Sequence, residues 1–298
     1  MGAHLSLSAP AKINLSLRVG AENAKNYHEI ASLVGFASIA DQLDLEKAET
    51  PSLQLRPKNL GPENAAIKTA DNLVWRAHKA MQNYVGAALP VAMVLQKNLP
   101  IAGGLGGGSA DAAACLLGLN QLFELKLPPA TLQKLAAPLG ADIAVCLTRQ
   151  PHFMRGIGDK LTPHHLPPAD ILLVNPQRPL ETAAVFARFE AQKTSEEKLK
   201  IVPPPNFSAL ADLVDYLKTQ GNDLTPAASA LVPEIALCLE NLAALPKCLY
   251  AAMSGSGASC FALFEKGYGA VALDTYRRAR PQDWAAHGEL MGALMGSQ

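Results

Sequence analysis

The amino-acid sequence predicts an α+β fold divided into two domains, and three observations lead to this prediction. The chain has 298 residues, which is enough for two domains of ordinary size with buried cores. Segments with the alternating apolar residues of strands are interspersed with segments that have the apolar spacing of helices. A proline-rich stretch, "PHHLPP" at 163–168, has the composition of a junction between domains. We therefore expect domains at 1–164 and 165–298.

The first half of the chain mixes both kinds of element. Residues 4–19 alternate like strands, and we expect two short strands or one long strand broken at Pro10. Thr69 and Asp71 are candidate N-caps of a helix that reaches residue 85. The other elements expected here are strands at 32–46, 52–57 and 90–100, a helix capped by Ser109 that ends near 120–122, a short helix from about 128, and a turn at Gly140 before an apolar run.

The second half restarts with a buried strand at 171–176. A charged and then proline-rich stretch, 193–207, is typical of an exposed loop. We expect a weakly determined tail after residue 279. The remaining expected elements are helices at 182–192, 207–218, 226–243 and 267–279, and strands at 248–253 and 260–265, on either side of a glycine-rich turn at 254–259.

The composition excludes several classes of protein. The 26 basic and 26 acidic residues cancel, and neither sign forms a long block, which argues against binding to nucleic acid or a membrane surface. No apolar run approaches the length of a membrane span, and the N-terminus lacks the pattern of a secretory signal. The five cysteines are odd in number and form no C-x-x-C pair, which predicts reduced thiols in a cytoplasmic protein without a zinc site. A small-molecule ligand fits best, and nothing in the sequence indicates an oligomeric state.

The stretch "GGLGGGS" at 103–109 places five glycines in six positions directly before a predicted helix. Such a turn aims several backbone N–H groups and the positive end of the helix dipole at one point, which favours phosphate. The stretch is not a Walker A loop, because Ser109 follows Gly108 where a Lys is required, and Ser109 also breaks the G-x-G-x-x-G fingerprint. Taken alone, it fits a hinge or a tightly packed turn equally well.

Three distant segments decide between these interpretations. They are "SAPAKINLSL" at 8–17, "LPIAGGLGGGSADAA" at 99–113 and "AMSGSGASCFALF" at 252–264. Together they resemble the three motifs of the galactokinase, homoserine kinase, mevalonate kinase and phosphomevalonate kinase superfamily. The resemblance implies the two-domain small-molecule kinase fold, with an N-terminal α+β domain that carries the ATP-phosphate loop, a C-terminal α/β domain and an active site in the cleft between them.

Within that superfamily, the chain resembles the 4-diphosphocytidyl-2-C-methyl-D-erythritol kinase family over nearly its whole length. The further segments that carry this likeness are "NYHEIASLVGFASIADQLDLE" (26–46), "DNLVWRA" (71–77), "LGADIAVCL" (139–147), "GIGDKLTP" (156–163) and "NDLTPAA" (222–228). The resemblance implies that the protein uses ATP and Mg²⁺ to phosphorylate the 2-hydroxyl of 4-diphosphocytidyl-2-C-methyl-D-erythritol, the acceptor, in non-mevalonate isoprenoid biosynthesis. A homoserine or mevalonate kinase, or a ligand sensor on the same fold, is the alternative.

The resemblance implies roles for two catalytic residues. Asp142 matches the catalytic Asp that accepts the hydroxyl proton, although an Asp in a "GAD" turn also suits a helix cap. Lys12 stands in an apolar strand, where an unpaired ammonium would be costly to bury, and the family pattern makes Asp142 its partner. A lysine that extends from a strand edge to solvent is the alternative. Asn14 lies on the same strand face as Lys12 and matches a substrate-holding residue.

The nucleotide site follows from the same resemblance. Asn72 matches a position near the adenine or ribose, and Lys97 matches a nucleotide-site position, although it also suits a solvated strand end. The Ser109 hydroxyl matches a group that contacts phosphate or Mg²⁺. Asp111 would repel phosphate if it faced inward, so we interpret it as structural. The phosphate loop itself comprises Gly103, Gly104, Leu105, Gly106, Gly107, Gly108 and Ser109.

The acceptor site is implied by an aromatic pair and a second glycine turn. Tyr27 and His28 match the cytidine-recognition pair, and Phe186 matches an aromatic that encloses the base with Tyr27. Plain core packing is the alternative for Phe186. Gly255 and Gly257 match a turn that approaches the substrate's diphosphate. Two departures from the family pattern are "KNYH" for Asp-Gly-Tyr-His, and Asn175 where the family usually has His.

Overall fold

The computed structural model describes residues 4–22, 28–58, 71–101, 103–192 and 199–292. The chain separates into two compact units, each assembled from segments that are distant in the sequence. Unit 1 comprises Met1–Ala11, Ala40–Ile101 and Gly106–Arg149, and unit 2 comprises Lys12–Ile39, Ala102–Leu105 and Gln150–Gln298. The boundary expected between residues 164 and 165 divides the sequence into two continuous pieces, and it stays a prediction.

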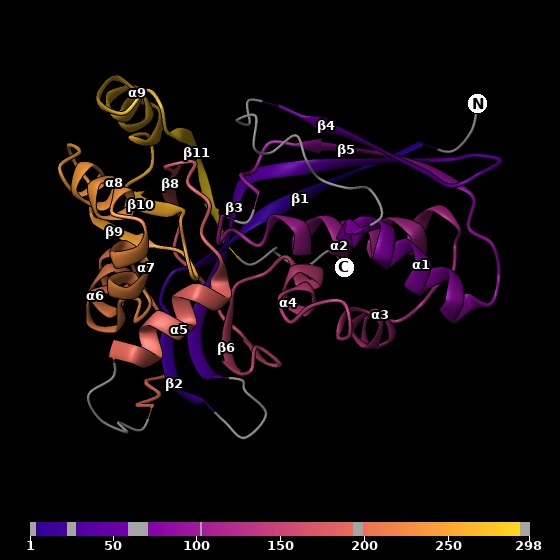
Figure 1. The fold of residues 1–298 in the computed structure, drawn as a ribbon, viewed down its shortest axis with the longest axis horizontal. Helices are drawn as coiled ribbons and strands as arrows, with labels where there is room; N and C mark the ends of the chain where they lie inside the picture. Colours follow the sequence, from indigo (N-terminus) through magenta and orange to yellow (C-terminus); the bar gives the residue numbers. More distant parts are fainter. Residues whose placement is uncertain (1–3, 23–27, 59–70, 102, 193–198, 293–298) are drawn as a thin grey trace. The chain divides into compact units, whose positions relative to one another are not determined.

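The described residues combine helices and strands, as the predicted α+β class requires (Figure 1). The strands are β1 (His4–Asn14), β2 (Arg18–Glu22), β3 (His28–Lys47), β4 (Ser52–Pro57), β5 (Val91–Lys97), β6 (His152–Gly156), β7 (Lys160–Pro163), β8 (Ala169–Asn175), β9 (Tyr250–Met253), β10 (Cys260–Phe264) and β11 (Trp284–Met291). The helices are α1 (Leu73–Val85), α2 (Gly107–Leu122), α3 (Pro129–Ala136), α4 (Ile143–Thr148), α5 (Thr182–Gln192), α6 (Leu210–Gln220), α7 (Thr225–Leu231), α8 (Glu234–Ala243) and α9 (Gly269–Ala279). No helix among these is long and apolar enough to cross a membrane.

Unit 1 places the alanine-rich helix α2 in its core. Strand β5 pairs antiparallel with the second half of β3 and parallel with β4. Helices α1 and α2 lie side by side, and α4 also packs against α2 (Figure 1). Gly118 permits the close packing of α2, because a Cβ there would overlap the side chain of Leu45 and lie 2.8 Å from Leu7. Small residues therefore bring α2, which carries the predicted phosphate loop at its start, tightly onto the strands.

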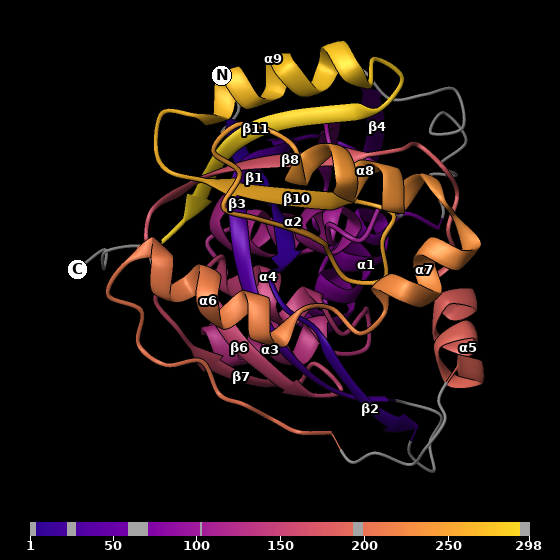
Figure 2. The same ribbon diagram turned by 90° about the vertical axis from the view of Figure 1, so that its left-hand side faces the viewer.

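Unit 2 is built on four antiparallel strands in the order β11, β8, β10 and β9. Helices α8 and α9 pack on these strands (Figure 2). The apolar residues between them form one core, and Leu17 and Val19 from the beginning of the chain belong to the same cluster. The segment around Leu17 and Val19 is therefore part of the core of unit 2.

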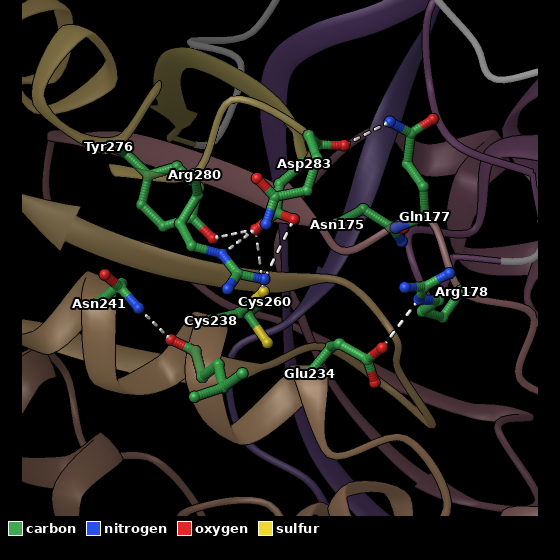
Figure 3. A network of polar contacts seen from close by, with 12 residues as sticks. Asn175, Gln177, Arg178, Glu234, Cys238, Asn241, Cys260, Tyr276, Arg280 and Asp283 are labelled. Carbon is green, nitrogen blue, oxygen red and sulfur yellow. Dashed lines mark hydrogen bonds and ion pairs between the residues drawn. The ribbon is translucent and has the colours of Figure 1, made fainter. Parts of the chain in front are cut away.

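A buried carboxylate fixes the connection between α9 and β11. The Asp283 side chain is fully buried, and its Oδ2 accepts a hydrogen bond from the Tyr276 hydroxyl at 2.8 Å and one from Arg280 Nε at 3.0 Å (Figure 3). Cys238 Sγ of α8 also donates to Oδ2 at 3.5 Å. Burial raises the pKa of the Cys238 thiol to about 12, so this thiol stays protonated. This network stabilises the fold, because every polar group in it is paired with another side chain.

The structure corrects three expectations about where elements break or end. Strand β1 continues through Pro10, and the break comes instead at residues 15–17. Proline on a strand edge without a paired neighbour gives up no strand-to-strand hydrogen bond, and β1 pairs with β3 alone among the described strands. The helix expected at 226–243 is two helices, α7 and α8, separated at Pro233, which cannot continue α7. The expected tail contains β11, whose pairing with β8 was not visible in local periodicity.

The starts of two helices also differ from the prediction. Helix α1 begins after Asn72, whose side-chain oxygen accepts from the backbone N–H of Val74 at 2.8 Å, and not after Asp71. The alternative cap, Thr69, lies outside the described residues. Helix α2 begins two residues before Ser109, with Gly106 at the N-cap position. Its φ of 61° is a left-handed conformation that glycine adopts without steric cost.

Candidate functional site

Two of the three distant motifs meet the first glycines of the phosphate loop within unit 2. The backbone N–H of Lys12 donates to the carbonyl oxygen of Leu105 at 2.9 Å. The backbone N–H of Asn14 donates to Ser254 Oγ at 3.1 Å, and that hydroxyl donates to the carbonyl oxygen of Gly104 at 2.9 Å. Ser254 therefore joins the N-terminal motif and the glycine loop, although it lies 240 residues from Asn14 and 150 from Gly104.

The second glycine turn fits closely against the first. Ser259 donates its backbone N–H to the carbonyl oxygen of Gly103 at 3.0 Å. Gly104 has φ +75°, and a Cβ there would overlap the carbonyl oxygen of Ser254 and lie 2.8 Å from that of Gly257. Only glycine allows this approach, because the obstructing atoms are backbone. The close approach of the two turns therefore gives a structural reason for glycine in both motifs, and neither motif shows that reason by itself.

Lys12 and Asn14 form a buried polar pair on β1. Lys12 Nζ donates to Asn14 Oδ1 at 2.9 Å, and the two residues are 4% and 3% exposed. Asn14 Nδ2 donates to Ser32 Oγ at 2.8 Å, and Ser32 in turn donates to the carbonyl oxygen of Ser16. This chain fixes the orientation of the Asn14 amide, with its oxygen toward the ammonium. The alternative of a lysine extended into solvent from a strand edge is wrong, because the ammonium is buried and paired.

The start of α2 provides the N–H groups that the sequence predicted for phosphate. Gly107, Gly108 and Ser109 are the first three residues of the helix, whose backbone N–H groups have no partner within the helix. Gly108 is exposed, and Ser109 is half-buried. The Ser109 hydroxyl makes no hydrogen bond to any residue that the structure describes. These groups have the arrangement of an anion-binding helix N-terminus.

Directly behind this helix start lies a cluster of buried charges from unit 1. Lys97 Nζ, at the end of β5, contacts Asp41 Oδ2 and donates to Asp111 Oδ2 at 2.7 Å. The three side chains are at most 5% exposed. Burial opposes the charge on Lys97, but the carboxylates outweigh it and hold its pKa above the ordinary value. Burial raises the pKa of Asp111 to about 7, against the opposing effect of the Lys97 ammonium. Lys97 is thus not a solvated strand end.

Asp142 occupies the N-cap position of α4 in unit 1. Its carbonyl oxygen accepts from the backbone N–H of Cys146 at 3.1 Å, and its residue surface is half-buried. Lys12 belongs to unit 2, so the predicted pairing of Lys12 with Asp142 stays a prediction. Asn72 is a helix cap in the structure, and its nucleotide role likewise stays a prediction.

Two residues predicted to bind the acceptor, His28 and Phe186, meet in an aromatic cluster. The ring of His28 stacks on Phe186 of α5, with ring centroids 4.8 Å apart and planes inclined by 24°. His28 Nδ1 lies 3.2 Å from the Gly20 carbonyl oxygen and 3.2 Å from Glu190 Oε1. Both neighbours accept hydrogen bonds, so Nδ1 carries a proton and Nε2 remains for another partner. Tyr27 lies outside the described residues.

Two further predicted positions receive a structural explanation. Phe186 also packs against the core of unit 2, as the core-packing interpretation expects, and its contact with a base stays a prediction. Asn175, at the end of β8, donates from Nδ2 to Ser259 Oγ at 2.8 Å and accepts from the backbone N–H of Gln177 at 2.7 Å. Asn175 therefore holds the second glycine turn. A Cβ on Gly255 would lie 3.3 Å from Asn14 Oδ1, which brings this turn beside the buried pair of β1.

Sequence reasoning missed several residues that the geometry brings into these groups. Asp41 pairs with Lys97 across 56 positions of sequence, and no local pattern marks such a pair. Glu190 follows Phe186 by one helical turn, a spacing that could have indicated a shared helix face. Ser254 lies within the glycine-rich turn at 254–259, where only the glycines were predicted to have a role.

Comparison with known proteins agrees with the family that the three motifs indicate. The family described as GHMP kinases N terminal domain matches residues 72–150, and GHMP kinases C terminal matches residues 205–282. The 4-diphosphocytidyl-2-C-methyl-D-erythritol kinase of Paramagnetospirillum magneticum is 40% identical over 288 residues, covering 96% of this chain and 98% of the relative. The chain belongs to the 4-diphosphocytidyl-2-C-methyl-D-erythritol kinase family. As a member, it is an ATP-dependent small-molecule kinase.

Other relatives agree with this membership. The kinase of the same name from Hyphomonas neptunium is 44% identical over 265 residues, covering 88% of this chain and 87% of the relative. A crystal structure of 4-(cytidine 5'-diphospho)-2C-methyl-D-erythritol kinase superposes with a TM-score of 0.76 at 29% identity, covering 97% of this chain and all of that one. The Methanococcus jannaschii mevalonate kinase, with a TM-score of 0.67 at 13% identity over 97% of this chain and 99% of that one, shares the fold.

Proposed function

We propose that this chain transfers the γ-phosphoryl group of ATP to the 2-hydroxyl of 4-diphosphocytidyl-2-C-methyl-D-erythritol, in non-mevalonate isoprenoid biosynthesis. A new bond joins the acceptor oxygen to the γ-phosphorus, the bond to the β–γ bridging oxygen breaks, and ADP leaves. The observation that carries the proposal is the hydrogen bonding that joins the three motifs: Lys12 donates to Leu105 of the phosphate loop, Asn14 donates to Ser254, and Ser254 and Ser259 of the "SGSGAS" turn donate to Gly104 and Gly103. A cytoplasmic location belongs to the proposal, since the five cysteines are free thiols and suit a reducing compartment.

The phosphates of ATP would be held by backbone N–H groups at the start of α2. Gly107, Gly108 and Ser109 supply three such groups together with the positive end of the helix dipole. Mg²⁺ fits here because the Ser109 hydroxyl has no described partner and because Mg²⁺ in phosphate sites needs few protein ligands. Ser109 would hold the ion, which would neutralise charge on the phosphates. Asn72, at the start of α1, would lie toward the adenine or ribose.

Asp142 would accept the proton that the hydroxyl loses as it attacks. A carboxylate suits this role because phosphoryl transfer needs positioning, charge neutralisation and a proton acceptor. Lys12 would stabilise the developing negative charge on the acceptor oxygen. Its hydrogen bond to Asn14 holds the ammonium at the end of β1, so little reorientation is needed during the reaction. Asn14 would also contact the acceptor.

The cytosine ring of the acceptor would lie against the aromatic cluster. Phe186 and Tyr27 would enclose the base, and His28 would present Nε2 to its edge, because Nδ1 is engaged by Gly20 and Glu190. Gly255 and Gly257 would admit the diphosphate close to the backbone, since neither carries a Cβ. A homoserine or mevalonate acceptor has no base, which would leave the aromatic cluster without a ligand.

The proposal is tested by measuring ADP release from ATP with a panel of acceptor alcohols. We expect turnover with the cytidyl acceptor alone, and a loss of at least about 10²-fold in kcat for Asp142→Asn. Asp274→Asn, an exposed carboxylate on α9, is the matched control and should retain wild-type kcat. Preference for mevalonate or homoserine would overturn the substrate, and full activity in Asp142→Asn would overturn the mechanism. ATP and acceptor binding without any turnover would favour the ligand sensor.

A further inference from the structure

The charged residues Lys97, Asp41 and Asp111, which we call the charge cluster, connect three elements of unit 1. Asp41 lies in β3, Lys97 ends β5, and Asp111 is the fifth residue of α2. The Lys97 ammonium bonds to one oxygen of each carboxylate. The other oxygen of Asp41 accepts from the backbone N–H groups of Asn98 at 2.6 Å and Leu99 at 2.9 Å. The cluster thus binds the segment that enters the phosphate loop as well as the helix that leaves it.

The charge cluster also touches the first turn of α2. A Cβ on Gly107 would lie 3.4 Å from Lys97 Nζ and 3.4 Å from Asp41 Oδ2. Both charged atoms therefore lie beside Gly107, close enough that any side chain at this position would contact them. Because Asp111 lies one turn further along α2, the cluster supports the helix start at two successive levels.

Stability alone does not account for the charge cluster. Asp111 Oδ1 is buried and has no hydrogen-bond partner among the described residues. A buried oxygen without a partner costs free energy, and buried ion pairs are commonly no better for stability than apolar side chains of similar size.

We propose that the charge cluster positions the ATP-phosphate site, with Asp111 and Lys97 acting as positioning residues that hold the α2 N–H groups in place. Lys97 acts on ATP through the helix, since its ammonium is engaged by two carboxylates and is 5% exposed. This inference rests on the proposed function in one respect, namely that the start of α2 receives the phosphates. It adds that the positions of Lys97, Asp41 and Asp111 determine how tightly the phosphates are held.

Two substitutions at one position test the proposal. Asp111→Ala removes the bond between α2 and Lys97 and leaves the Lys97–Asp41 pair intact. Asp111→Asn keeps the length of the side chain and leaves an amide oxygen that can accept from the Lys97 ammonium. We expect Asp111→Ala to weaken the binding of Mg²⁺ and ATP by about tenfold or more, which corresponds to ~1.4 kcal/mol. Asp111→Asn should remain within about threefold of wild type, and the KM for the acceptor should be unchanged in both variants.

The measurement is calorimetric titration of each folded protein with Mg²⁺ and ATP in the absence of acceptor, followed by kcat and KM for each substrate. Urea unfolding establishes that each variant is folded, and Asp111→Ser, too short to reach Lys97, replaces Asp111→Ala if the latter does not fold. Wild-type ATP affinity in Asp111→Ala or Asp111→Ser would overturn the proposal, as would equal losses in Asp111→Asn. Wild-type protein that binds no ATP would instead overturn the proposed function.

Discussion

Replacing Gly104 by alanine is expected to damage the glycine loop far more than the same change at another left-handed glycine. Gly104 has φ +75°, and an added Cβ would overlap the carbonyl oxygen of Ser254 and lie 2.8 Å from that of Gly257. Gly86, after α1, has φ +66° and nothing within 4 Å of its Cβ position. The two alanine variants therefore share the backbone strain and differ in the steric conflict.

The magnitudes follow from these two contributions. A left-handed conformation costs an alanine about 1–2 kcal/mol, which is the whole cost expected for Gly86→Ala. Gly104→Ala adds an overpacking cost of about 1–3 kcal/mol, because the obstructing atoms are backbone and cannot rotate away. The sum for Gly104→Ala is about 2–5 kcal/mol. If the loop moves to relieve the conflict, the hydrogen bonds from Ser254 and Ser259 are lost at about 1 kcal/mol each.

Urea unfolding and steady-state kinetics of both variants measure the difference. We expect Gly104→Ala to lose at least about 1 kcal/mol more unfolding free energy than Gly86→Ala, together with most of its kcat/KM for ATP. Gly86→Ala should keep wild-type kinetic constants. Equal unfolding free energies combined with unchanged kinetics in Gly104→Ala would refute the close approach of the two glycine turns.

Three further changes probe other parts of the chain. Glu190→Ala should raise the KM of the cytidyl acceptor several-fold and leave that of ATP unchanged, because His28 loses one of the two acceptors that orient its ring; an unchanged acceptor KM would contradict this role. Tyr276→Phe removes the hydroxyl that donates to buried Asp283, so the urea midpoint should fall by an amount equivalent to about 2 kcal/mol, with kcat unaltered. Burial lowers the folded-state pKa of His152, so the unfolded chain binds the proton more readily and stability falls as the pH drops below about 6.5; the unfolding free energy of His152→Gln should fall less over that range.

The sequence allowed most elements of the fold to be predicted, because local residue types mark them. Helix α2 and strands β5 and β8 lie close to their expected positions, since α2 is rich in alanine and leucine, β5 alternates in burial and β8 is a short apolar run. The tail after residue 279 could not be predicted, because β11 is stabilised by pairing with β8, and that pairing depends on residues more than 100 positions away. The strand break expected at Pro10 was wrong for a related reason, since the effect of a proline depends on which edge of β1 is paired.

The candidate site divides in the same way. Residues that carry a motif, such as Lys12, Asn14 and the glycines, could be named as candidates before any geometry was known. The residues that hold them in place could not, because Ser254 and Asp41 act through contacts across long sequence separations. Lys97 illustrates the limit best, since nothing in the sequence indicated that two carboxylates surround its ammonium.

The shared core of unit 2 has a consequence for the order of events during synthesis on the ribosome. Leu17 and Val19 belong to the same cluster as Ala285, so the first and the last parts of the chain must both be present before that core closes. A nascent chain halted near residue 164 would expose these apolar side chains without the strands that cover them. Chaperone occupancy of the nascent N-terminal segment should therefore persist until the final strand has emerged from the exit tunnel.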